Sequence, residues 1–178
     1  MGLTLFDVQQ YENTQEMASS SKNLSRHSDK NIRKVAGKKF AIVVAEWNEE
    51  VTESLYNGAV ETLLKYGVEQ QNILKKEVPG SFELSLAAQW MAENPEVDAV
   101  ICLGCVIQGE TRHFEFICNA VAQGLTQVGL KYNKPVIFGV LTPNTQQQAL
   151  DRAGGKHGNK GDEAAISAIK MLGFQSFL

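Results

Sequence analysis

The sequence predicts an α/β fold, a three-layer α-β-α sandwich in which a four-stranded parallel sheet carries helices on both faces. From residue 38 onward, apolar runs of strand length alternate with segments of helical period. Two of these runs are almost continuously apolar, as in parallel strands that are covered on both faces. The chain has 178 residues, of which 43% are hydrophobic, and this is enough for one domain with a sizeable core.

Four strands account for the apolar runs, at residues 40–47, 73–78, 97–107 and 134–142. The second is shorter and more polar than the others, which predicts a position at an edge of the sheet. The third is the most apolar, which predicts a central position. Crossover connections of this length are right-handed and join parallel strands.

Helical periodicity predicts five helices, at residues 53–67, 81–94, 113–132, 144–152 and 162–173. Gly67 is a natural C-cap for the first of them. Ser81 is expected to cap the second, and Asn144 with Gln147 resembles a capping box at the fourth. The glycine-rich segment 153–161 is expected to be a loop.

Residues 1–37 are expected to form a mobile N-terminal arm in front of a single domain of residues 38–178. Residues 18–34 are rich in Ser, Asn and charge, so they cannot bury enough apolar surface to order themselves. The first residues lack the basic start and apolar core of a secretory signal, and no apolar stretch is long enough to cross a bilayer. The chain is therefore expected to be cytoplasmic.

Net charge and cysteine usage argue against several classes of function. The net charge of −3 argues against a general nucleic-acid or membrane role, since both need a basic surface. Cys102 and Cys105 form a C-x-x-C, but a strand would point them to opposite faces. With no second such pair, and His113 as the one further candidate ligand, we expect buried thiols and no metal or cofactor site.

Polar residues gather after each predicted strand, where ligands bind in open parallel sheets. Trp47 follows the first strand and could either stack on a flat ligand or pack in the core. After the second strand, Gly80 could let the backbone approach a ligand or could simply form a turn. Glu83 suits the first turn of the next helix, because a carboxylate favours the positive end of the helix dipole.

The residues after the third and fourth strands indicate an anion site. Residues 109–111 (Gly-Glu-Thr) open the long helix, whose free backbone N–H groups can hold a phosphate. His113 follows in the same turn, where it could transfer protons or serve only the structure. Arg152 and the basic loop after it suit a phosphate, and they equally suit a solvated helix end. Together these signals describe one pocket with an aromatic wall, a phosphate subsite and a histidine.

Five motifs resemble one known family, the 6,7-dimethyl-8-ribityllumazine synthases. They are AEWN (45–48), VPGSFEL (78–84), GCVIQGETRHFEFIC (104–118), PVIFGVLT (135–142) and DRAGGKHGNKGDEAA (151–165). The resemblance extends from about residue 40 to residue 174. It implies a flavodoxin-like order of the four strands.

The resemblance implies an enzyme of riboflavin biosynthesis that joins 5-amino-6-(ribitylamino)uracil to 3,4-dihydroxy-2-butanone 4-phosphate. Phosphate and two waters leave, and no cofactor or metal takes part. His113 would be the catalytic proton-transfer residue. The substrate-binding residues that it implies are Trp47, Asn48, Ser81, Phe82, Glu83, Ile107, Glu110, Thr111, Phe138, Arg152 and Lys160.

In the family's arrangement, Trp47 would stack on the pyrimidine and Glu83 would accept hydrogen bonds from the ribityl hydroxyls. The backbone N–H of Glu110, together with Thr111 and Arg152, would hold the phosphate. Phe138, Arg152 and Lys160 would come from the adjacent subunit, because the family builds its site across an interface.

The family forms pentamers, and some pentamers assemble into decamers or hollow sixty-subunit shells. The short loop at residues 154–161 resembles that of shell-forming members and favours a shell, and riboflavin synthase is a further expected partner. Two positions depart from the family pattern. Gln108 stands where relatives often have a basic residue, and Glu46 stands where Arg is frequent.

Three other functions compete with this interpretation. A flavin- or pterin-binding module would use the same pocket but would have no need of a proton shuttle such as His113. An archaeal-type riboflavin synthase shares the fold but needs no phosphate subsite, so Arg152 and the turn at residues 109–111 argue against it. A purely structural shell protein would not need the intact set of site residues.

Overall fold

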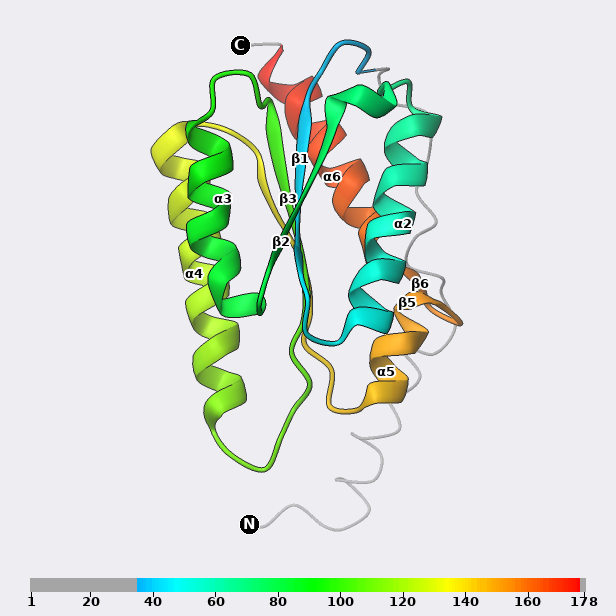
Figure 1. Ribbon diagram of the computed structural model, residues 1–178, viewed down its shortest axis with the longest axis vertical. Coiled ribbons are helices and arrows are strands. Elements are labelled where there is room, and N and C mark those ends of the chain that lie inside the picture. Colours follow the sequence, from blue (N-terminus) through cyan, green and yellow to red (C-terminus); the bar gives the residue numbers. More distant parts are fainter. Residues whose placement is uncertain (1–34, 177–178) are drawn as a thin grey trace, which may run out of the picture.

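The computed structural model describes residues 35–176 and confirms the predicted α/β sandwich (Figure 1). Its elements in chain order are β1 (Phe40–Ala45), α2 (Glu49–Lys65), η2 (Gln70–Asn72), β2 (Ile73–Val78), η3 (Ser81–Glu83), α3 (Leu84–Glu93), β3 (Ala99–Cys105), α4 (His113–Tyr132), β4 (Val136–Leu141), α5 (Gln146–Asp151), β5 (Ala153–Gly155), β6 (Gly158–Asn159) and α6 (Lys160–Gln175). The N-terminal arm expected at residues 1–37 lies outside the described residues except for its last three. None of the described helices is long and apolar enough to span a membrane.

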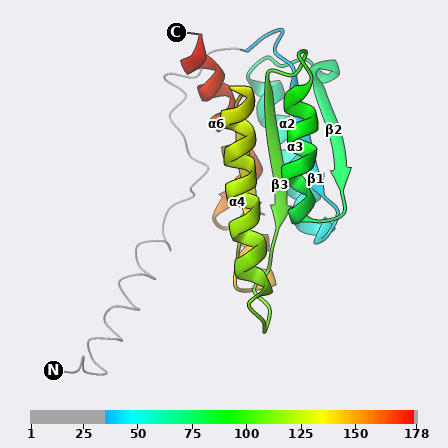
Figure 2. The same ribbon diagram turned by 90° about the vertical axis from the view of Figure 1, so that its left-hand side faces the viewer.

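The main sheet has the strand order β2-β1-β3-β4, and each of its pairings is parallel. This is the predicted flavodoxin-like order, with the polar strand β2 at an edge and the apolar strand β3 in the interior. Helices α2 and α6 cover one face of the sheet, and α3 and α4 cover the other (Figure 1). Figure 2 shows α3 and α4 side by side in front of the sheet.

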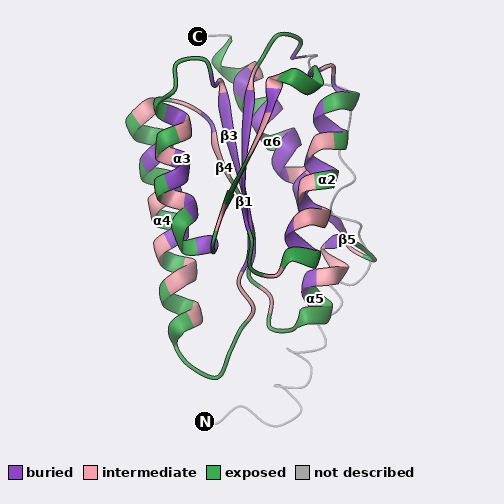
Figure 3. Cartoon of the chain, in the orientation of Figure 1, coloured by how far each residue is buried: buried purple, intermediate pink, exposed green. Residues whose placement is uncertain are grey.

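Alternation along the central strands supplies a separate core for each face. Ile42 and Ile101 face α2 and α6, whereas Val43 and Cys102 face α3 and α4. All four are fully buried, and Figure 3 shows the buried residues along the sheet and the inner sides of the helices. Cys105 belongs to the α2 and α6 side, so the two cysteines of the C-x-x-C lie on opposite faces, as predicted.

Helix α2 ends where the sequence predicts but begins at Glu49 rather than at residue 53. Its C-terminus is a Schellman motif around Gly67, which has a φ of +91°. The N–H groups of Gly67 and Val68 donate to carbonyls of the last turn at 3.0 and 3.1 Å. The first turn was missed because it carries Glu49 and Glu50, which have no apolar period but suit the positive end of the dipole.

Three local predictions are wrong. Ser81 does not cap α3, because its side chain makes no capping hydrogen bond. The fourth predicted helix, α5, is capped by Thr145, whose Oγ1 accepts from the Gln148 N–H at 3.2 Å, so both capping residues lie one position after the predicted Asn144 and Gln147. The segment 153–161 is not a plain loop, because β5 and β6 pair there as an antiparallel hairpin.

Candidate active site

The carboxyl ends of the parallel strands meet at one edge of the sheet, at the bottom of Figure 1. The loops that follow β1, β2 and β3 are tied together there. The N–H groups of Glu46 and Trp47 donate to the carbonyls of residues 78 and 79, at 2.8 and 3.2 Å. The side-chain Nδ2 of Asn48 donates to the Cys105 carbonyl at 2.9 Å, which links the first loop to β3. These bonds make the three loops one surface.

An aromatic rim lines this surface. Trp47 and Phe82 are 67% and 56% exposed, so the interpretation of Trp47 as a core residue is wrong. Glu83 is exposed on the same rim, and Ile107 is half-buried and packs against the core beneath it. Accessible aromatic faces beside a carboxylate can hold a flat ligand that carries hydroxyl groups.

The side chain of Ser81 points away from this surface. Its Oγ is buried, has no hydrogen-bond partner among the described residues, and faces Gly104 of β3. A Cβ added to Gly104 would lie only 2.5 Å from that oxygen. Ser81 is the first residue of η3, where the backbone N–H has no partner within the helix. The group that Ser81 can offer to a ligand is therefore this N–H.

The start of α4 forms the second part of the edge. Glu110, Thr111 and His113 are all exposed, and His113 is the first residue of the helix. The His113 N–H points at the Thr111 Oγ1, 3.4 Å away. Arg112 turns away to pair with Glu115 at 3.1 Å. The first turn of α4 therefore combines helix N–H groups, a hydroxyl and an imidazole, as the sequence predicts.

Arg152 belongs to a separate basic cluster at the end of α5. Its Nη1 donates to the His157 carbonyl at 2.6 Å, and its Nη2 lies 2.6 Å from Oε1 of Glu163. Lys160 contacts the other oxygen of Glu163 at 3.1 Å. Burial would raise the pKa of the Glu163 carboxyl, but the hydrogen bonds and charges of Arg152 and Lys160 outweigh it and lower the pKa below its ordinary value.

Within one chain the two groups of predicted site residues lie apart. Arg152 ends α5 on the α2 and α6 side of the sheet, whereas His113 begins α4 on the opposite side (Figure 1). Phe138 lies on the edge strand β4, is 36% exposed, and pairs with Cys102 in the register of the sheet. One chain therefore presents its imidazole on one side of the sheet and its basic cluster on the other.

The thiols and the acidic groups offer little further chemistry. Burial raises the pKa of the Cys105 thiol to about 11 and raises that of Cys102 further, so neither is a ready nucleophile. In residues 35–176 no cluster of His, Cys, Asp and Glu has the arrangement of a metal site.

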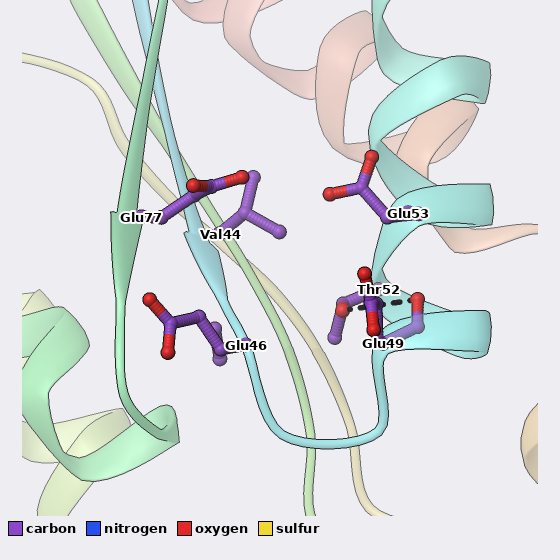
Figure 4. Close-up of a pocket in the computed structure, with 7 residues that line it drawn as sticks. Val44, Glu46, Glu49, Thr52, Glu53 and Glu77 are labelled. Carbon is purple, nitrogen blue, oxygen red and sulfur yellow. Dashed lines mark hydrogen bonds between the residues drawn. The ribbon is translucent and has the colours of Figure 1, made fainter.

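An acidic pocket of about 280 Å³ lies between the ends of β1 and β2 and the start of α2, and no sequence pattern predicts it (Figure 4). It is lined by the glutamates 46, 49, 53 and 77 together with Val44, Ala45 and Thr52. Lys75 neutralises part of this charge through contacts of 2.6 and 2.8 Å to Glu53 and Glu77. Because the pocket is lined by carboxylates, it is unsuited to an anionic substrate.

Sequence reasoning missed one residue of the site, Glu163, and one contact within it, between Gly80 and Trp47. Glu163 forms ion pairs with both basic residues of the α5 cluster. It lies eleven residues beyond Arg152, in a segment whose pattern predicts only the start of a helix. Gly80 was noted, but its contact with Trp47 depends on a loop pairing that no local pattern reveals.

The fold and the site define a class of protein, an α/β sandwich with a small-molecule site at the carboxyl edge of a parallel sheet. Residues 37–176 match the family described as 6,7-dimethyl-8-ribityllumazine synthase. The protein of that name from Cytophaga hutchinsonii is 67% identical over 156 residues, which cover 88% of this chain and 98% of the relative. The one from Parabacteroides distasonis is 51% identical over 160 residues, which cover 90% of this chain and all of the relative. The chain therefore belongs to the 6,7-dimethyl-8-ribityllumazine synthase family.

Proposed function

We propose that the residues at the carboxyl edge of the sheet form the substrate site of a 6,7-dimethyl-8-ribityllumazine synthase, completed by a neighbouring subunit. Family membership over nearly the whole described chain carries the activity itself: the protein is an enzyme of riboflavin biosynthesis, in the transferase class. The substrates are 5-amino-6-(ribitylamino)uracil and 3,4-dihydroxy-2-butanone 4-phosphate. The observation that best supports the site is the hydrogen-bonded pairing of the loops after β1 and β2, which carry Trp47 and Glu83, at the same edge of the sheet from which α4 starts with His113.

The pyrimidine binds on the aromatic rim in this proposal. Trp47 stacks on the ring and Phe82 borders it, since both side chains are more than half exposed. Glu83 accepts hydrogen bonds from the ribityl hydroxyls. The backbone N–H of Ser81 and the side chains of Asn48 and Ile107 complete this part of the site.

The phosphate binds between the start of α4 and the basic cluster of a neighbour. The N–H of Glu110 and the hydroxyl of Thr111 contribute from one subunit, where the helix dipole also favours an anion. Arg152 and Lys160 contribute from the other. With Glu163 between them, this cluster keeps a net positive charge of one, which attracts the phosphate.

His113 moves protons during the condensation. The amine of the uracil forms an imine with the ketone as water leaves, phosphate is then eliminated, and a second water leaves as the ring closes. An imidazole beside the phosphate can take up and return these protons near neutral pH. Holding two substrates in reacting geometry provides most of the acceleration, and the histidine adds a smaller factor.

A ring of subunits would bring the two parts of the site together. The described chain carries two distinct apolar surfaces. One is a stripe of Phe82, Leu86 and Trp90 along η3 and α3, each more than half exposed, and the other is a groove of about 490 Å³ between α4, β4 and α6. Two different surfaces that fit each other produce head-to-tail contacts, and such contacts form a ring when the rotation between neighbours closes.

We take this ring to be the pentamer that the resemblance implies, with further assembly into a shell favoured by the short loop at residues 154–161. Phe138, Arg152 and Lys160 then reach the neighbour's rim. Residues 1–37 form an arm outside the domain in this proposal, the enzyme is cytoplasmic, and riboflavin synthase is a partner.

The test of the activity is to mix the purified protein with both substrates under anaerobic conditions and follow the fluorescence of the lumazine. We expect a rate well above the slow uncatalysed condensation. A rate equal to that background from a folded oligomer would leave the second candidate, a flavin- or lumazine-binding protein without chemistry. A binding titration with lumazine and with flavin would then distinguish a binding protein from a structural one.

A further inference from the structure

Gly80, between β2 and η3, is a glycine whose backbone does not require glycine. Its φ of −149° and ψ of 177° are extended values that any residue adopts. It is buried nonetheless. The reason for a glycine at this position must therefore be the space that a Cβ would occupy.

That space is filled by Trp47. A Cβ on Gly80 would lie 2.7 Å from Cε3 and 2.9 Å from Cζ3 of the indole, and 3.2 Å from Oε2 of Glu83. The two carbons belong to the six-membered ring of the indole. Ordinary van der Waals contact begins at 3.4 Å, so any side chain larger than hydrogen would push the ring away by about 0.7 Å.

The ring, rather than the backbone, is the part that would move. The N–H of Trp47 is bonded to the carbonyl of Pro79, the residue before Gly80, at 3.2 Å. The preceding N–H is bonded to the end of β2 at 2.8 Å, and Asn48 is bonded to β3. With both flanks fixed, the indole can yield only by rotating its own side chain, and it is already two-thirds exposed.

We propose that Gly80 is a positioning residue for the reaction. Because it has no Cβ, it leaves a space in which the indole of Trp47 lies, and we call this space the seat of the indole. The same absence of a Cβ keeps the Glu83 carboxylate beside that ring. The seat sets the angle at which the aromatic wall meets the pyrimidine. Gly80 acts through Trp47 and Glu83, and its effect is therefore specific to the pyrimidine substrate. This inference rests on the proposed role of Trp47 in substrate binding.

The test is a cycle of three variants, Gly80→Ala, Trp47→Phe and the double variant, with Gly173→Ala as the matched control. Nothing lies within 4 Å of a Cβ on Gly173, so this control adds a methyl group that no neighbouring side chain contacts. For Gly80→Ala we expect the KM of the ribitylaminouracil to rise on the order of tenfold, because a displacement approaching 1 Å at a positioning group has large effects. The KM of the butanone phosphate should stay unchanged.

Phenylalanine lacks the two indole carbons that meet the new methyl group. In the Trp47→Phe background, the Gly80→Ala change should therefore cost much less, and the two changes should be strongly non-additive. Equal losses in both backgrounds would overturn the proposal, since the glycine would then serve the close approach of a ligand. Failure of both Gly80→Ala and the double variant to fold would also count against it.

A second measurement does not depend on activity. The chain has two tryptophans, so Trp90→Phe leaves Trp47 as the only one. In that background, Gly80→Ala should raise the acrylamide quenching constant of Trp47, because the indole leaves its seat. Unchanged quenching would refute the seat even in an active enzyme. A changed quenching constant in a protein without synthase activity would instead refute the proposed function and leave the seat standing.

Discussion

Glu163→Gln tests the basic cluster at the end of α5. The wild-type carboxylate accepts from Arg152 at 2.6 Å and from Lys160 at 3.1 Å, and the side chains of Arg152 and Glu163 are only 19% and 18% exposed. A hydrogen bond to a charged group contributes about 1.5–3 kcal/mol, and glutamine keeps a neutral version of one of the two. We therefore expect the variant to lose about 2 kcal/mol of unfolding free energy at pH 7, which is a fall of about 4–8 °C in Tm for a chain of this size.

The pH dependence follows from the lowered pKa of Glu163. A carboxyl with a lower pKa in the folded state stabilises the fold fully above its unfolded pKa and loses that contribution as the pH falls through the folded pKa. Below that pH a protonated Glu163 resembles the glutamine. The difference between wild type and variant should therefore be full at pH 7 and should shrink towards zero in acid.

Denaturant unfolding at fixed protein concentration, at pH 7 and in acid, measures both quantities. Glu115→Gln is the control, because its partner Arg112 is 80% exposed and an exposed pair contributes little. Equal stability of Glu163→Gln and wild type at pH 7 would refute the reasoning. So would a difference that persists unchanged in acid, since it could not then arise from the carboxylate.

Three further predictions concern separate parts of the molecule. His113→Ala should lower kcat by roughly 10–100-fold while the oligomer still assembles in analytical ultracentrifugation, and an unchanged kcat would remove the imidazole from the mechanism. Gly161→Ala should destabilise the fold by about 1–3 kcal/mol or more in denaturant unfolding, because its Cβ would lie 1.8 Å from the Leu55 carbonyl oxygen, and wild-type stability would contradict this. Under native conditions a thiol reagent should modify Cys118 before Cys105, because deeper burial raises the pKa of Cys105 to about 11; mass spectrometry showing the reverse order would contradict this.

The sequence predicted the layers of the fold because those depend on local periodicity. The apolar runs predicted β1 as a strand covered on both faces and β3 as the central strand, and the Gly67 C-cap was found because left-handed backbone selects glycine. Element starts were less predictable. The first turn of α2 and the cap of α5 consist of polar residues, and several neighbouring residues could have served equally well.

The parts of the candidate site that directly follow a strand could be predicted from the sequence. Trp47 and His113 lie at the edge that the strand order implies, but whether Trp47 was buried could not be read from its neighbours. The contacts of Glu163 with Arg152 and of Trp47 with Gly80 could not be predicted. They depend on how a hairpin folds back and on how two loops pair, and these are long-range properties of the packed chain.

The claim that each site is shared between subunits is tested most directly by mixing two impaired variants. In oligomers assembled from equal amounts of His113→Ala and Arg152→Ala chains, some interfaces contain an intact His113 from one subunit and an intact Arg152 from its neighbour. Random assembly of a ring gives such an interface at about a quarter of positions, so we expect lumazine formation at about a quarter of the wild-type rate. Activity no higher than that of the separate variants would show that both residues must come from one chain, and would contradict the account.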